Sequence, residues 1–352
     1  MTDGIGWDLG GAHLKAVRLN EAGHVLSVVQ WPCPLWRGLS YLEQAIDESL
    51  ASLGHSRHHA VTMTGELADI FPKRSEGVAR LVETISRKLP GVELKIFAGR
   101  HGFVAPGAAE ENVGEIASAN WLASAQYAAH RCGNGILVDM GSTTTDIVLL
   151  HDGSAQPLGF SDAERLTAEE LVYTGVIRTP VMAVAHRVPF DGQWQRLTAE
   201  HFATMADVHR LTGNLDTAHD MAETADGAGK SLQESARRLA RMVGRDLDDA
   251  AMDRWVELAF FLADAQLQDV RVAVERVLSR GMEDESLPLI GAGAGRFMVR
   301  ELARQMRRDY VDFADLLEGT NDLKAWAAVC APAFAIAWLA GGKQAGLARE
   351  RL

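Results

Sequence analysis

Short apolar runs near the N-terminus predict β-strands. Runs over residues 4–8, 14–19 and 25–31 are separated by turns that contain glycine, so we expect three consecutive strands in a meander. Between Leu39 and Leu53 the apolar positions instead recur at helical spacing, which predicts an amphipathic helix. The same patterns predict further strands at 59–64, 93–97 and 135–139 and further helices at 78–89 and 114–131. This part of the chain is therefore predicted to be α/β.

Beyond residue 150 the pattern becomes predominantly helical. Residues 167–170 and 231–234 both have the form of a capping box, with a hydroxyl at the N-cap and a carboxylate three residues later, and predict two helix starts. Apolar positions across 248–280 predict one long or broken helix that ends at Gly281. The apolar stretch 325–340 is shorter than the roughly 20 residues that span a bilayer and contains a proline, so we expect a buried C-terminal helix.

A strand–turn–strand unit with the same polar residues occurs twice. Asp8-Leu9-Gly10-Gly11-Ala12-His13-Leu14-Lys15 follows one apolar run, and Asp139-Met140-Gly141-Ser142-Thr143-Thr144-Thr145-Asp146 follows another. Glycine lets the backbone approach a ligand, successive amide N–H groups can bind phosphate oxygens, and aspartate can bind a divalent cation. Two such hairpins that face each other would form a phosphate clamp.

A third glycine motif follows a short predicted strand at 288–290. Gly291-Ala292-Gly293-Ala294-Gly295 then leads into a predicted helix at 296–306. Glycine loops at this place also serve close packing of helix against strand, and a single Asp-x-Gly turn is common as a tight turn. The order of all three motifs is what favours phosphate binding.

Composition and charge narrow the class of protein. The 352 residues are 47% hydrophobic and 23% charged, which is enough for two domains with their own cores. The net charge of −12 argues against a nucleic-acid partner and favours small anions bound at a local site. The N-terminus lacks the pattern of a signal peptide, and the three cysteines are far apart, so we expect a cytoplasmic protein that is not bound to a membrane. The oligomeric state is open, and a homodimer is one candidate.

The three glycine motifs resemble the phosphate-1, phosphate-2 and adenosine motifs of the superfamily that contains actin, Hsp70 and sugar kinases. The resemblance implies two ribonuclease-H-like α/β domains facing each other across a cleft, at 1–132 and 133–352. It also implies a helical insertion at about 165–285 and a C-terminal helix that crosses back. Phosphates and a metal would lie between the hairpins, with Mg²⁺, and ATP or another nucleotide, as the implied cofactors.

Mapped by motif, the resemblance assigns magnesium to Asp8, Asp139 and Asp146. It assigns phosphate binding to Gly10, Gly11, His13, Lys15, Gly141, Ser142, Thr143, Thr144, Gly291, Gly293 and Gly295. His13 stands where relatives are expected to have Asn or Thr, so a phosphate contact from that side chain would become pH-dependent.

The second hairpin looks especially like the hydantoinase/oxoprolinase branch, whose enzymes are much longer. A more similar group is a compact family linked to tetrahydromethanopterin-dependent one-carbon metabolism. The resemblance rests on both hairpins and on the segments 63–69, 117–123 and 206–213. It implies that the chain joins an aminomethylfuran-methyl diphosphate to the phenol of tyramine or γ-glutamyltyramine, forming an aryl ether and releasing pyrophosphate. Archaeal members serve methanofuran, and bacterial members, from methylotrophs, would serve methylofuran.

Two carboxylates are candidates for the chemistry. Glu66 follows the strand after which sugar kinases in this superfamily place their catalytic carboxylate, and a phenol of pKa near 10 gains from a base. The alternative is that Glu66 caps a helix start or is solvated. Asp207 lies near His209 and Arg210 on a predicted helix, where the alternative is a surface ion pair between Asp207 and Arg210.

Two further functions stay open beside the ether synthase. The clamp could hold nucleotide phosphates in an ATP-dependent small-molecule kinase or a hydantoinase/oxoprolinase-like ATPase. It could also belong to a non-catalytic nucleotide switch of the actin or Hsp70 type. The third glycine loop favours a nucleotide, whereas the compact family favours a diphosphorylated furan.

Overall fold

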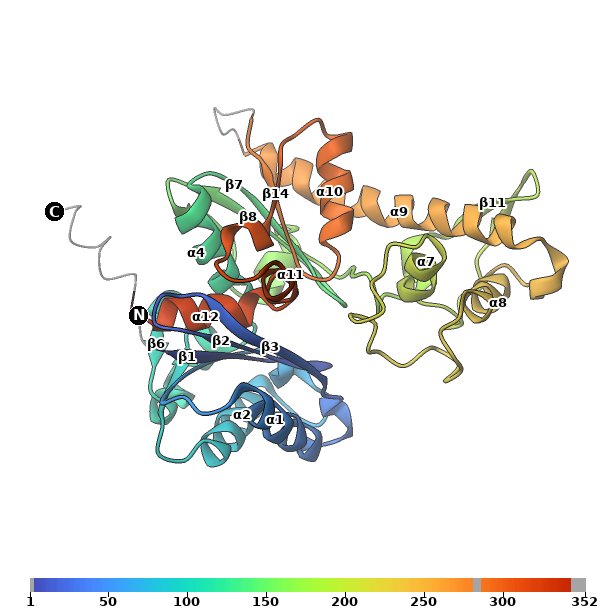
Figure 1. Cartoon of the computed structure of the whole chain (residues 1–352). Helices are drawn as coiled ribbons and strands as arrows, with labels where there is room; N and C mark the ends of the chain where they lie inside the picture. Colours follow the sequence, from blue (N-terminus) through green and yellow to red (C-terminus); the bar gives the residue numbers. More distant parts are fainter. Residues whose placement is uncertain (1–2, 281–285, 343–352) are drawn as a thin grey trace. The chain divides into compact units, whose positions relative to one another are not determined.

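The computed structural model describes residues 3–280 and 286–342 (Figure 1). Its contacts divide the chain into two compact units. Unit 1 comprises Met1–Leu137, Val148–Ala168 and Val311–Leu352, and unit 2 comprises Val138–Ile147 and Glu169–Tyr310. The chain first leaves unit 1 close to the boundary expected after residue 132. It then returns twice, so more than the C-terminal helix crosses back.

Unit 1 is built on a six-stranded sheet of order β3-β2-β1-β4-β5-β6. The predicted meander is confirmed, because β1 pairs antiparallel with β2 and β2 with β3, while β4 joins β1 in parallel. The strands are β1 (Gly4–Leu9), β2 (His13–Leu19), β3 (Val25–Pro32), β4 (His58–Met63), β5 (Glu93–Phe97) and β6 (Phe103–Val104). Every residue of β1 is buried, as expected for a central strand covered on both faces.

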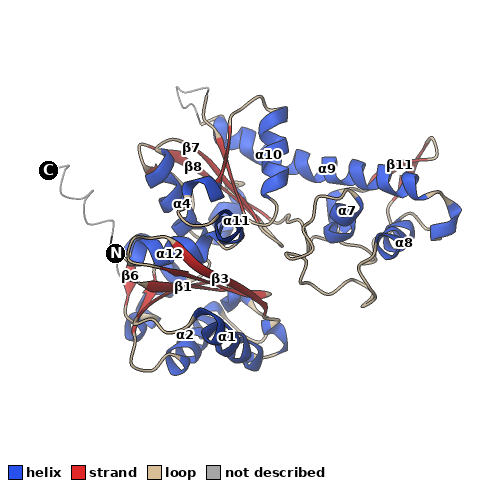
Figure 2. Ribbon diagram, viewed as in Figure 1, coloured by secondary structure: helices blue, strands red, loops and turns tan. Residues whose placement is uncertain are grey.

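Helices cover both faces of this sheet (Figures 1 and 2). On one side lie α1 (Leu39–Leu53) and α2 (Arg74–Lys88), and on the other lies α12 (Ala331–Ala340), against which α4 (Asn120–Cys132) packs in turn. Gly6 of β1 lets α12 approach closely, since a Cβ at this position would lie 2.0 Å from the Ala333 carbonyl oxygen. The buried helix expected at 325–340 is therefore confirmed for α12, whereas residues 325–329 belong to a separate helix that ends before Cys330.

No single helix among the described residues is long and apolar enough to cross a membrane. The pair α11 (Asn321–Val329) and α12 passes that test only when taken together, and the chain bends by 101° between them.

The second sheet has the order β10-β8-β7-β13-β14, with β9 paired to β8. Its strands are β7 (Gly135–Met140), β8 (Thr145–His151), β9 (Ser154–Ala155), β10 (Leu171–Val172), β13 (Leu289–Ala292) and β14 (Tyr310–Asp312). Helix α10 (Arg296–Gln305) follows β13 as predicted. Each sheet thus contains one of the two repeated hairpins.

The rest of unit 2 is mainly helical. It contains α6 (Val181–Val184), β11 (Arg187–Phe190), β12 (Gln193–Arg196), α7 (Met205–Leu211), α8 (Leu232–Met242) and α9 (Met252–Leu278). Trp255 of α9 is fully buried in a core that α7 and α8 share. Helix α9 is continuous, while Gly281, its expected end, lies outside the described residues. The short hairpin β11–β12 was not predicted.

The helix start predicted at Thr167 is wrong. Helix α5 (Asp162–Thr167) ends there, and the capping box that begins it joins Ser161 and Glu164. Residues 161–164 and 167–170 both fit the capping pattern and begin six residues apart. The pattern alone therefore does not determine which of them starts a helix. Glu169 then adopts φ 52° and the chain enters β10, which pairs with β8 instead of continuing a helix.

The helix predicted over 114–131 is broken in two. The short α3 (Val113–Ile116) and the longer α4 are separated by three residues, of which Ser118 has φ 54°. A left-handed residue other than glycine interrupts a helix and is uncommon. The interruption turns the Ser118 side chain toward Glu66, as described below.

Candidate functional site

The two hairpins close in the same way. In the first, the Gly10 N–H donates to the His13 carbonyl at 3.1 Å, and in the second the Gly141 N–H donates to the Thr144 carbonyl at 2.8 Å. Asp8 precedes the first turn and is 4% exposed. The repeat inferred from the sequence is therefore also a repeat of backbone geometry.

The polar side chains of the first hairpin are engaged by unit 1 itself. Lys15 lies opposite Asp8 in the β1–β2 pair, and its ammonium donates to the carbonyl oxygen of Val329 at 3.1 Å. His13 is buried, with 6% of its surface exposed. Phosphate binding by Gly10, Gly11, His13 and Lys15 stays a prediction, and for Lys15 it would require exchanging this contact for a ligand.

The first hairpin lies directly beside the segment that carries Glu66. The Thr64 N–H donates to the Leu9 carbonyl at 3.1 Å, which continues the parallel pairing of β1 with β4. A Cβ on Gly65 would lie 2.9 Å from the Leu9 oxygen, so the two backbones approach as closely as glycine allows. The structure thus brings Glu66 to the hairpin of Gly10 and Gly11.

Glu66 is a buried carboxyl with one oxygen engaged. Its side chain is 1% exposed, and Oε1 accepts a hydrogen bond from the Ser118 hydroxyl at 2.8 Å. Within the described part of the chain Oε2 has no hydrogen-bond partner. Burial raises the pKa of Glu66 to about 7, although the Ser118 hydrogen bond opposes the shift. The alternative that Glu66 is solvated is therefore wrong.

Three residues around Glu66 were missed in the sequence. The Ser118 hydroxyl also lies 3.4 Å from Asp162 Oδ2, and Arg74 pairs with that carboxylate at 2.5 Å. A second carboxylate, paired with Arg74, thus lies next to Ser118. Ser118 belongs to the segment 117–123 that carries the family resemblance, which was the available signal. Arg74 and Asp162 are too far apart in sequence for any local pattern to pair them.

The second hairpin is held by the segment that follows β10. The carbonyl of Gly141 accepts from the Val176 N–H at 3.1 Å. The carbonyl of Ser142 accepts from the N–H groups of Ile177 at 3.2 Å and of Arg178 at 2.8 Å. These bonds fix the orientation of the peptide groups in the turn.

The third glycine loop packs on the end of β7, so the second and third motifs come together in unit 2. The Gly295 N–H donates to the Met140 carbonyl at 2.8 Å. Gly293 has φ 82°, and a Cβ there would lie 2.6 Å from Asp139 Oδ1. Only glycine fits this position.

Close packing also explains the other two glycines of the loop. A Cβ on Gly291 would lie 2.7 Å from the hydroxyl of Tyr310, and one on Gly295 would lie 2.6 Å from Met140 Cγ. The packing interpretation therefore holds for both, while nucleotide binding by this loop stays a prediction.

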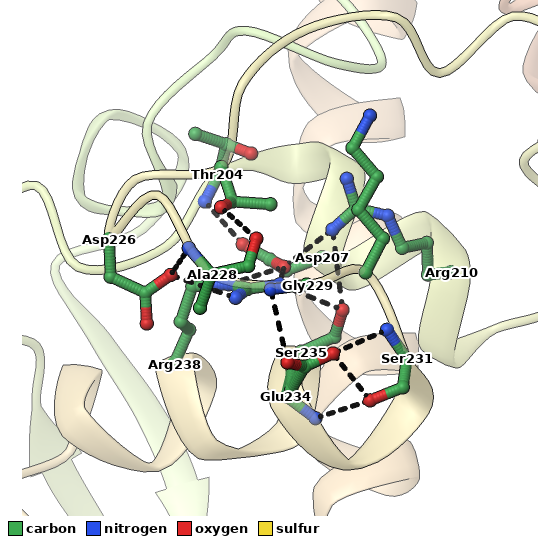
Figure 3. A network of polar contacts seen from close by, with 12 residues as sticks. Thr204, Asp207, Arg210, Asp226, Ala228, Gly229, Ser231, Glu234, Ser235 and Arg238 are labelled. Carbon is green, nitrogen blue, oxygen red and sulfur yellow. Dashed lines mark hydrogen bonds and ion pairs between the residues drawn. The ribbon is translucent and has the colours of Figure 1, made fainter.

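Asp207 lies at the centre of a buried ion-pair network rather than on the surface (Figure 3). It is 1% exposed, accepts from the Thr204 N–H at 3.1 Å as part of a capping box, and pairs with Arg210 and Arg238, each at 2.7 Å. Asp220 further binds Arg210, and Asp226 binds Arg238. These contacts give the buried Asp207 a structural role. Its role in the chemistry stays a prediction.

The described residues contain no group of three or more His, Cys, Asp and Glu side chains placed to hold a metal ion. Asp139 and Asp146 flank the second turn with the same spacing as Asp8 and Lys15 in the first. Carboxylate oxygens are suitable Mg²⁺ ligands, and Mg²⁺ is commonly bound by one or two carboxylates together with substrate phosphates. Binding of Mg²⁺ by Asp8, Asp139 and Asp146 therefore stays a prediction.

Comparison with known proteins places the chain in a family. Residues 57–317 match the family model described as Hydantoinase/oxoprolinase. A (4-{4-[2-(gamma-L-glutamylamino)ethyl]phenoxymethyl}furan-2-yl)methanamine synthase from Methanocaldococcus jannaschii is 28% identical over 277 residues, which are 78% of this chain and 82% of that protein. The synthase of the same name from Methanococcus vannielii is 31% identical over 147 residues, or 41% of this chain and 66% of that protein.

Solved structures agree on the fold. An acetone carboxylase determined without nucleotide superposes with a TM-score of 0.58 at 11% identity, covering 95% of this chain and 70% of that chain. A PilM–PilN type IV pilus biogenesis complex gives a TM-score of 0.50 at 12% identity, with 97% and 99% covered. The chain thus shares its α/β fold with these proteins, and it belongs to the hydantoinase/oxoprolinase family.

Proposed function

We propose that the chain condenses an aminomethylfuran-methyl diphosphate with the phenol of tyramine or γ-glutamyltyramine, forming an aryl ether and releasing pyrophosphate. The observation that carries the proposal is the similarity to the M. jannaschii synthase over most of both chains. The printed product of that enzyme contains a phenoxymethyl link between a phenyl ring and an aminomethylfuran. A synthase that joins these two halves must make this ether, and two phosphate-type hairpins suit a diphosphate leaving group.

In the proposed reaction the phenol oxygen attacks the furfuryl carbon. The carbon–oxygen bond to the diphosphate breaks, pyrophosphate leaves with the bonding electrons, and the phenol proton passes to a base. A phenol of pKa about 10 is mostly protonated at neutral pH, so a nearby base lowers the barrier. Glu66 suits this role, because its pKa of about 7 lies near neutral pH and its Oε2 is available as an acceptor among the described residues.

The leaving group would be stabilised at the hairpins. Backbone N–H groups of the two turns would bind its oxygens, and Asp8, Asp139 and Asp146 would hold Mg²⁺ that enters with the diphosphate. When bound, the metal would offset the negative charge that accumulates on the departing pyrophosphate. The reaction as written needs no cation other than the bound Mg²⁺ and the positively charged side chains of the protein.

An ATP-dependent kinase or ATPase is the second candidate, and one observation favours it. The third glycine loop lies against Asp139 and Met140, where a nucleotide-binding loop is expected in this superfamily. The two candidates differ in what they consume, since the ether synthase needs no ATP.

The test supplies purified protein with the furan diphosphate, tyramine or γ-glutamyltyramine, and Mg²⁺, and follows ether and pyrophosphate by mass spectrometry and a coupled assay. The proposal predicts both products in equal amounts without ATP. Glu66→Gln should lower kcat by about 100-fold or more, the usual contribution of a general base. Glu83→Gln makes the same change at an exposed position of α2 and should leave kcat unchanged. Absence of ether, together with ATP hydrolysis stimulated by a small molecule, would favour the kinase-like reaction instead.

A further inference from the structure

The segment 174–179 is the support on which the second hairpin rests. Its N–H groups bind the carbonyls of Gly141 and Ser142, as described above. A Cβ on Gly175 would lie 2.5 Å from both Ser142 C and Thr143 N, so the two backbones are in direct contact. The Thr145 hydroxyl adds a bond of 2.6 Å to the Thr174 carbonyl. A residue placed on this segment is therefore fixed relative to the turn.

The support is itself anchored to helix α9. Gln266 is fully buried, and its Nε2 donates to Thr174 Oγ1 and to the Gly175 carbonyl, both at 2.9 Å. Its Oε1 lies 2.8 Å from Nε2 of His209, which is also fully buried. Satisfied buried polar groups of this kind hold a backbone in one conformation. The helical part of unit 2 thus preorganises the segment behind the turn.

Arg178 is the cation that this arrangement presents at the turn. Its N–H is bound to Ser142, its side chain is exposed, and its guanidinium Nη1 lies 3.5 Å from the Thr143 hydroxyl. The turn itself is flanked by Asp139 and Asp146, so its own side chains contribute negative charge. A polyanion needs a positive partner there, and guanidinium binds two phosphate oxygens at once.

The first hairpin supplies its cation differently. Lys15 occupies the position that Asp146 has in the second copy, and its ammonium is engaged by the Val329 carbonyl. The cation at the second hairpin therefore comes from outside the repeated motif, which is why the repeat itself does not reveal it.

We propose that Arg178, together with the Thr143 hydroxyl, binds the phosphate oxygens of the ligand at the second hairpin. The proposal rests on the proposed function for the identity of that ligand, a diphosphate ester and its pyrophosphate product. Arg178 is thereby assigned to substrate binding and leaving-group stabilisation.

The test measures pyrophosphate and ATP binding to the whole chain by isothermal titration with Mg²⁺, for wild type, Arg178→Ala, Arg178→Lys and Arg254→Ala. Loss of the guanidinium should weaken pyrophosphate binding by about 10- to 100-fold, as expected for charge-assisted hydrogen bonds. Lysine should restore part of the affinity, since it keeps the charge but not the two-pronged geometry. Arg254 is exposed at the start of α9 and serves as the matched control, with unchanged affinity expected.

The outcomes separate this proposal from the proposed function. Equal pyrophosphate affinity of wild type and a folded Arg178→Ala would overturn the role of Arg178 and leave the ether synthase standing. Wild type that binds ATP but not pyrophosphate, with ATP binding weakened in Arg178→Ala, would support the role of Arg178 and overturn the proposed reaction. A steady-state assay adds a second readout, because the variant should raise KM for the diphosphate and leave KM for the phenol unchanged.

Discussion

Replacing Asp207 by Asn tests the ion-pair network of unit 2 and the role of its central carboxylate. The substitution removes the charge shared by Arg238, whose side chain is fully buried, and Arg210, whose side chain is 8% exposed. Removing one partner of a buried pair leaves an uncompensated charge and costs about 3–5 kcal/mol. Each arginine keeps a second carboxylate, Asp226 or Asp220, so we expect the lower end.

The expected loss is about 3 kcal/mol in the free energy of unfolding, because the Asn carbonyl can still accept the Thr204 N–H and keep the helix cap. Urea unfolding followed by tryptophan fluorescence measures it, since Trp255 is buried in the same core. Asp253→Asn makes the same chemical change at an exposed site on α9 and should shift stability by less than about 0.5 kcal/mol.

An Asp207→Asn variant that unfolds at the same urea concentration as wild type would refute the reasoning. If its turnover were lost while its stability stayed intact, Asp207 would act in the chemistry and the catalytic prediction would gain support. A destabilised variant that retains turnover at low temperature would assign Asp207 to structure alone.

Three further predictions follow from buried groups. Gly6→Ala should lower the free energy of unfolding by about 2 kcal/mol or more, because the added Cβ would clash with α12. Gly107→Ala is the control, because its Cβ would meet no atom within 4 Å. Equal melting temperatures of the two variants would contradict this prediction. Burial lowers the pKa of His209 from 6.5 to about 4, so the unfolded chain takes up the proton first and stability should fall as pH drops from 6.5 to 4. His209→Gln should remove this dependence of stability on pH, and an unchanged dependence would mean that His209 does not cause it. Ser118→Ala removes a hydrogen bond that lowers the pKa of Glu66, so the acid limb of the pH–rate profile should move above its wild-type position near 7; a limb that does not move would mean that Glu66 does not set it.

The hairpins and most elements were predictable because their signals are local. An apolar strand, an Asp-x-Gly turn and a second apolar strand occupy about fifteen consecutive residues, and the backbone closes both turns with the same hydrogen bond. Helix α9 was predictable for a similar reason, since its apolar positions repeat over many turns.

The surroundings of Glu66 were not predictable because they depend on pairs distant in sequence. Ser118 reaches Glu66 only because a left-handed residue breaks the expected helix, and no propensity favours a serine there. Arg74 and Asp162 are separated by 88 residues. Burial of Asp207 was hidden for the same reason, since a spacing of three residues predicts its pairing with Arg210 but not the second arginine of α8.

The most direct measurement follows the phenol oxygen through the proposed reaction. The phenolic substrate is labelled at that oxygen with a heavy isotope and incubated with the furan diphosphate, Mg²⁺ and purified protein, and both products are weighed by mass spectrometry. Attack by the phenol on the furfuryl carbon predicts that the label stays in the ether, that pyrophosphate is unlabelled, and that ATP is not required. Label lost from the ether, or ether formed only with ATP, would contradict the account.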